Sequence, residues 1–238
     1  MALAFIGWKS FYLAIADAGP ALAIFLQCLV LSRFLNPKNR DYPIAIIFTV
    51  ILLILSAITY LLQFDRNLIP GGSDLYDVLA ITDLAMHVLL LTLMLQLTKK
   101  TLDSLGLNSN SVWILAAISF AVLAVSYAVF FENKIYDRFF KVRQVVSFWM
   151  VLLNLYWWTL LLRRRKVDRR TMLLSAGIGL IMTGQTIADG LIAWVGRAPL
   201  YAYLSLAFLI MYLTNYACLY AWYTAFHPAN ADPKLADK

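Results

Sequence analysis

Three aspartates, Asp17, Asp83 and Asp189, lie inside long apolar stretches of this chain. A carboxylate in an apolar medium is costly unless it meets a cation, another polar group or water. Acids in such surroundings can bind cations, hold small ligands or relay protons. These residues are therefore the first candidates for function.

Further polar side chains join this set. His87 follows Asp83 by four residues, so both share one helix face, where a carboxylate and an imidazole can hold an ion pair. The predicted ligand or proton site opens to the outside and comprises Asp17, Asp83, His87, Gln185, Asp189 and Asn215. The alternative is that these groups hydrogen-bond between helices and fix only their packing, with Arg143 and Arg197 neutralising the acids.

The composition indicates the medium around these residues. Hydrophobic residues make up 62% of the 238 residues and charged residues 14%, about half the usual charged share. A water-soluble chain could not cover so much apolar surface with so few polar groups. The sequence therefore predicts an all-α integral membrane protein of a plasma membrane or a bacterial inner membrane.

Seven apolar stretches reach the roughly 20 residues that a membrane-spanning helix needs. They predict a single seven-transmembrane-helix bundle in residues 1–226, followed by a short tail, 227–238. Pro20 is expected to disturb the first helix. The predicted spans are 11–35, 43–63, 75–98, 111–131, 144–162, 171–195 and 200–226.

Basic residues give the expected orientation. With seven spans, one set of loops and ends holds 13 lysines and arginines and the other holds 7. Because segments rich in these residues stay in the cytoplasm, the N-terminus is expected outside and the C-terminus inside. In this orientation Asp17, Asp83 and Asp189 all lie roughly 12–14 Å below the outer edge. One basic cluster is expected to contact anionic lipid or a partner protein: Arg163, Arg164, Arg165, Lys166, Arg169 and Arg170.

Several membrane chemistries do not fit the residue inventory. A retinal Schiff base is excluded because it needs a buried lysine, and every lysine lies in a predicted loop, a tail or a span end. Two histidines and one glutamate are too few for a catalytic metal site, so no metal is predicted. His87 could ligate a single haem or chlorophyll, although a lone histidine in a span more often serves packing. The net charge of +7 is attributed to lipid contact and not to nucleic acid.

Three functions remain compatible with these observations. The favoured one is a non-catalytic membrane subunit or adaptor within a larger assembly of membrane proteins, because no catalytic set and no output domain are recognisable. The first alternative is a seven-helix receptor or sensor that has an outward-facing acidic cavity and signals through a partner. The second is a small proton- or cation-coupled transporter that uses the same acids.

Overall fold

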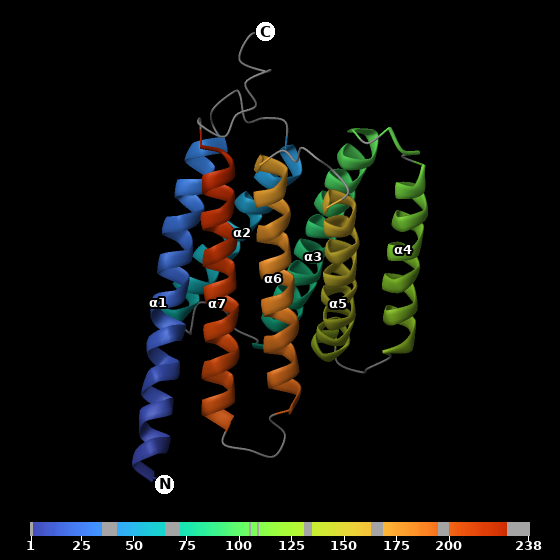
Figure 1. Ribbon diagram of the computed structural model, residues 1–238. Helices are drawn as coiled ribbons and strands as arrows, with labels where there is room; N and C mark the ends of the chain where they lie inside the picture. Colours follow the sequence, from blue (N-terminus) through green and yellow to red (C-terminus); the bar gives the residue numbers. More distant parts are fainter. Residues whose placement is uncertain are drawn as a thin grey trace.

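The computed structural model describes residues 2–34, 42–64, 72–104, 106–108, 110–130, 135–162, 169–194 and 200–227, and this part of the chain contains helices and no strand. The prediction of an all-α chain is confirmed. Figure 1 shows the seven helices in chain order: α1 (Ala2–Phe34), α2 (Pro43–Phe64), α3 (Gly72–Ser104), α4 (Ser111–Val129), α5 (Ile135–Leu162), α6 (Arg169–Trp194) and α7 (Leu200–Ala225).

Five of these helices, α3 to α7, contain a stretch long and apolar enough to cross a membrane. The described parts of α1 and α2 contain shorter apolar stretches, Ala18–Phe34 and Pro43–Ile58. In lipid, a helix satisfies its backbone hydrogen bonds internally, which is why such stretches fold as helices there. The helical architecture and these five helices support a membrane protein.

One expectation about helix boundaries needs correction. The fifth helix begins at Ile135 and not near 144, because backbone hydrogen bonding continues past the apolar stretch into charged residues. Lys141 and Arg143 therefore lie within α5 instead of before it. The first helix runs unbroken from Ala2 to Phe34 with Pro20 inside it, so the proline does not end the helix. Neighbouring helices can support a proline in a membrane helix, and α1 packs against both α2 and α7.

Six of the helices pack in a closed ring. In cyclic order α1, α2, α3, α5, α6 and α7 each contact the next, and α7 returns to α1. Helices α3 and α6 also touch across the interior, whereas α4 packs outside the ring against α5 and α3, at the right of Figure 1. The interior between α2, α3, α6 and α7 is thus surrounded laterally by helices.

Helix α4 presents most of its surface away from the bundle. Trp113 and Phe120 are 73% and 72% exposed, while small Ser119 and Ser126 are buried on the inner face. The indole of Trp149 on α5 donates to Ser119 Oγ at 2.9 Å. An apolar outer face with small inner residues is the pattern of a helix that packs on one side and meets lipid on the other.

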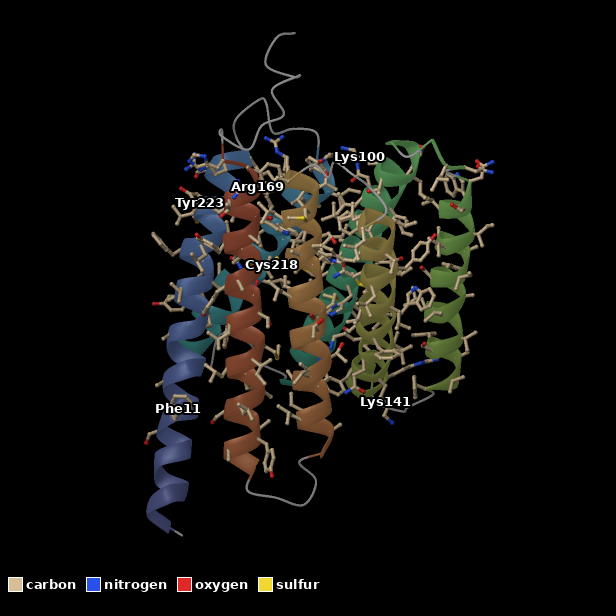
Figure 2. All side chains as sticks on the ribbon, viewed as in Figure 1. Phe11, Lys100, Lys141, Arg169, Cys218 and Tyr223 are labelled. Carbon is tan, nitrogen blue, oxygen red and sulfur yellow. The ribbon has the colours of Figure 1, made fainter. Side chains whose placement is uncertain are left out.

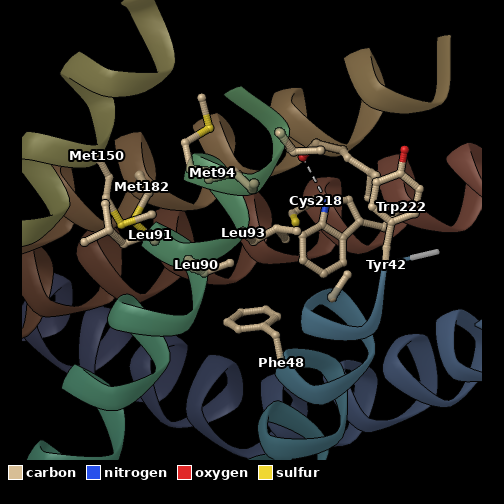
Figure 3. Packing of buried hydrophobic residues seen from close by; sticks show 14 of the residues in the cluster. Tyr42, Phe48, Leu90, Leu91, Leu93, Met94, Met150, Met182, Cys218 and Trp222 are labelled. Atoms are coloured by element: carbon tan, nitrogen blue, oxygen red, sulfur yellow. Dashed lines mark hydrogen bonds between the residues drawn. The ribbon is translucent and has the colours of Figure 1, made fainter. Parts of the chain in front are cut away.

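The buried interior combines aromatic rings with leucine and methionine side chains, and Figure 3 shows Phe48 and Trp222 among them. The Trp222 indole on α7 donates to the carbonyl oxygen of Leu174 on α6 at 3.1 Å, and its ring lies 5.6 Å from that of Phe48. A side chain of that size fits because Gly177 faces it: a Cβ built on Gly177 would come within 2.5 Å of Trp222 Nε1. The glycine therefore lets α6 and α7 approach closely.

Candidate functional site

The centre of the candidate site is Arg143 on α5. Its Nη1 donates to Asp83 Oδ2 on α3 and its Nη2 to Asp189 Oδ1 on α6, both at 2.5 Å. The side chains of Asp189 and Arg143 are 2% and 14% exposed, and that of Asp83 is 39% exposed. One guanidinium thus joins three helices, which is the charge-assisted pairing that buried ions require.

Two amides support the buried acid. Gln185 Nε2, one turn before Asp189 on α6, donates to Asp189 Oδ1 at 3.1 Å. Gln144 Nε2 on α5 lies 3.5 Å from the backbone oxygen of Asp189. The Asp189 carboxylate therefore accepts from Gln185 on its own helix and from Arg143 on α5, and these hydrogen bonds hold it in place.

The tautomer of His87 follows from its neighbours. Its Nδ1 lies 2.7 Å from the backbone oxygen of Asp83 and 3.7 Å from Asp83 Oδ1. Because a carbonyl oxygen only accepts hydrogen bonds, Nδ1 carries the proton and donates it. In the neutral ring Nε2 is then an acceptor, and among the described residues it has no hydrogen-bond partner.

A cavity of about 190 Å³ adjoins this cluster. It lies between α2, α3, α6 and α7, inside the ring of helices. Figure 3 shows three residues of its apolar wall, Phe48, Leu90 and Met182. The described residues that line it are Phe48, Leu52, Asp83, Met86, His87, Leu90, Ile181, Met182, Gln185, Phe208, Met211, Tyr212, Thr214 and Asn215.

The cavity brings together four residues of the predicted site, Asp83, His87, Gln185 and Asn215. Asp189 is not on the cavity wall but contacts Gln185 and, through Arg143, is joined to Asp83. The side chain of Asp17 lies outside the described residues, although its backbone belongs to α1. Asp83 and Asp189, which were predicted to lie at the same depth, thus pair with the same arginine.

The sequence-based site omitted Arg143 and Gln144. Arg143 was expected only as a possible neutralising charge at the beginning of a span, and nothing pointed to Gln144. The sequence did contain a signal for Arg143: it lies next to an apolar stretch that packs beside the acids. A buried acid pair needs a cation at the same depth, and Arg143 is at that depth in α5.

No metal site is formed by the described residues, because no group of three or more histidine, cysteine, aspartate or glutamate side chains converges there. Arg143 instead lies between the two carboxylates. The arrangement can hold charge and accept hydrogen bonds from a molecule in the cavity.

The predicted basic cluster is described only in part. Arg163, Arg164, Arg165 and Lys166 lie outside the described residues. Arg169 is exposed, at the same end of the bundle as Lys100 and Tyr223 (Figure 2). Arg170 is buried, with Nε donating to the carbonyl oxygen of Ala225 at 3.3 Å and the guanidinium over the Phe226 ring. Its contacts tie α6 to the end of α7.

Comparisons with family models, curated proteins and solved structures found no match to this chain. The function is therefore inferred from the geometry of the site.

Proposed function

We propose that this chain is a membrane receptor or sensor that binds a small molecule in the cavity between α2, α3, α6 and α7. The observation that carries the proposal is that this cavity adjoins the Asp83, Arg143 and Asp189 cluster and shares Asp83 with it. Small-molecule sites are typically concave, mostly apolar and equipped with a few convergent polar groups. Eight of the lining residues are apolar aliphatic or phenyl side chains, and Asp83, His87, Gln185 and Asn215 converge among them.

A purely structural role accounts for less of the geometry. Interhelical pairing explains the contacts of Arg143 with the two acids. It does not explain a cavity next to them, since interiors are normally close-packed. Nor does it explain Nε2 of His87 and Oδ1 of Asn215, two buried acceptors with no partner among the described residues.

In this proposal all seven helices cross the bilayer, with the N-terminus outside and the cavity nearer the outer side. The bias of basic residues supports this orientation. A membrane-impermeant maleimide applied to intact cells tests it with the variants Ala2→Cys and Lys234→Cys. Only the first is expected to react, and labelling of both from the same side would contradict the topology.

The subunit or adaptor role remains a prediction from the sequence. The exposed apolar face of α4 is compatible with it, but lipid covers such a face equally well. The receptor proposal also needs a signalling partner, for which the basic end of the bundle near Arg169 is the candidate surface.

A matched pair of tryptophan substitutions tests ligand binding. Met211 lines the cavity, whereas Leu213, two residues away on α7, is exposed and outside the lining. Small apolar and amphipathic compounds are screened for those that raise the unfolding temperature of the purified chain in detergent. Met211→Trp is expected to fill the cavity and abolish the shift, while Leu213→Trp retains it.

Two outcomes would contradict the proposal. If no compound small enough for the cavity raises the unfolding temperature, the ligand site is wrong. The same conclusion follows if the two tryptophan variants respond alike to every active compound.

A further inference from the structure

We infer that the ligand of this cavity is a small organic cation, an amine attached to a compact aromatic body. This inference rests on the proposed ligand-binding function and specifies its ligand class. It follows from the charge of the site, the hydrogen-bonding groups left for a ligand, and the chemistry and size of the walls.

The charge of the cluster is unbalanced. Asp83 and Asp189 contribute two negative charges and Arg143 one positive charge, so these three side chains carry a formal charge of −1. Both carboxylates pair with the same guanidinium, and one charge therefore remains uncompensated in surroundings of low polarity. Asp83, the more exposed of the two acids, is also the one on the cavity wall. A cation in the cavity would balance the cluster.

The hydrogen-bonding groups favour a donor. His87 Nε2, in the tautomer that the Asp83 carbonyl imposes, accepts a hydrogen bond. Asn215 Oδ1 also accepts, and neither atom has a partner among the described residues. Both residues line the cavity together with Asp83. Acceptors from α3 and α7 around one cavity match an ammonium group, which has only donors.

The remaining walls suit an apolar and aromatic body. Three of the chain's 7 methionines line the cavity: Met86, Met182 and Met211. Their thioethers are polarisable and contact aromatic rings favourably. Phe48, Phe208 and Tyr212 add aromatic rings, whose faces attract organic cations.

Size limits the ligand further. A cavity of roughly 150 Å³ in an engineered protein binds benzene, so this one, at about 190 Å³, holds one ring with a short polar substituent. A hard inorganic cation is a poorer match, since such ions take several oxygen ligands and most of this wall is apolar.

Benzylamine and benzyl alcohol provide the test, because they match in size and differ in charge. Their dissociation constants for the purified full chain are measured by calorimetry near neutral pH and constant ionic strength. Benzylamine, protonated under these conditions, is expected to bind at least tenfold more tightly than the alcohol. Asp83→Asn is expected to remove most of this preference, since it leaves Arg143 and Asp189 as a balanced pair.

Two further variants keep the test specific. Asp103→Asn on the same helix changes an exposed acid outside the cavity lining, and it should retain the preference for the amine. Asn215→Leu removes one acceptor without changing the charge and should weaken benzylamine binding more than benzyl alcohol binding.

Three results would overturn the ligand class. These are equal affinities of the amine and the alcohol for the unmodified chain, no binding of benzylamine, or a rise in unfolding temperature with sodium or potassium ions equal to that with benzylamine. Each of these leaves the proposed ligand site to be judged separately, because the Met211→Trp and Leu213→Trp comparison uses uncharged compounds as well.

Discussion

The interior of the bundle contains two regions of opposite character. The cavity region comprises the cavity and the Asp83, Arg143 and Asp189 cluster, and there polar groups meet an open space inside the ring. The aromatic region surrounds Trp157, Trp222 and Phe226, which are fully or almost fully buried. The same helices, α3, α6 and α7, contribute to both regions.

The two regions handle cations differently. In the cavity region Arg143 pairs with two carboxylates. Beside the aromatic region Arg33 lies over the Tyr223 ring and Lys100 over the Tyr42 ring, at 4.6 Å and 4.0 Å from the ring centroids. A deeply buried cation needs full counter-charges, whereas near the end of a bundle a ring face suffices because part of the charge stays hydrated. The carboxylate pairs of Arg143 thus lie beside the cavity, whereas Arg33 and Lys100 contact aromatic rings.

Replacing Arg143 should produce the largest effect. Arg143→Met leaves Asp189 buried without its cation, and the free energy of unfolding is expected to fall by about 3–5 kcal/mol. Denaturant titration of the purified chain in detergent measures the loss. Adding Asp83→Asn and Asp189→Asn removes the uncompensated charges, so the triple variant should regain more than half of it. A triple variant as unstable as Arg143→Met alone would contradict the electrostatic explanation.

Alanine substitutions at two glycines of α6 test how tightly each of the two regions is packed. An alanine Cβ at Gly177 would meet Trp222, and one at Gly184 would meet Thr214, a cavity-lining residue. Gly177→Ala is expected to destabilise by about 1–3 kcal/mol because the buried indole cannot move away. Gly184→Ala is expected to destabilise by a similar amount, about 1–3 kcal/mol, since its Cβ would come within 2.6 Å of Thr214 Cβ, which rotation of the threonine side chain does not move.

The same denaturant titration measures both glycine variants. A loss below about 1 kcal/mol at Gly184, with the expected loss at Gly177, would show that α6 and α7 can move apart beside the cavity but not beside Trp222.

A smaller effect than at Arg143 or Gly177 is expected at Arg33. Its Nη2 donates to the Tyr223 hydroxyl at 2.6 Å, and its guanidinium stacks on the same ring. Arg33→Met should lower the free energy of unfolding by only about 1 kcal/mol, in the range of one cation–π contact or one hydrogen bond. A loss as large as that of Arg143→Met would mean that ring contacts and carboxylate pairs stabilise buried cations equally well.

Much of the fold was predictable because it depends on local properties. Apolar stretches placed the helices close to where they occur, since length and hydropathy along a continuous segment decide whether it can form a membrane helix. Counting residues from the helix ends placed Asp83 and Asp189 at one depth, because the rise per residue is constant. The boundary of α5 was less predictable, since charged residues such as Lys141 continue a helix without adding hydropathy.

The candidate site was predictable only in its parts. The types and spacing of Asp83 and His87 indicated a shared helix face, and their contacts agree with that spacing. The sequence offered Arg143 as a neutralising charge, but not that one guanidinium joins Asp83 to Asp189, because these partners are 60 and 46 residues away along the chain. Which helices are neighbours depends on the fit of many side chains at once.

The sequence by itself determined a chain of apolar helices that carry a few costly acids, because hydropathy and helix rise are properties of each segment alone. Only the tertiary structure decided that six helices close into a ring, that two acids share one guanidinium, and that His87 and Asn215 line one cavity. The physical reason is that packing and ion pairing act through space between distant segments, so they exist only once the helices are assembled.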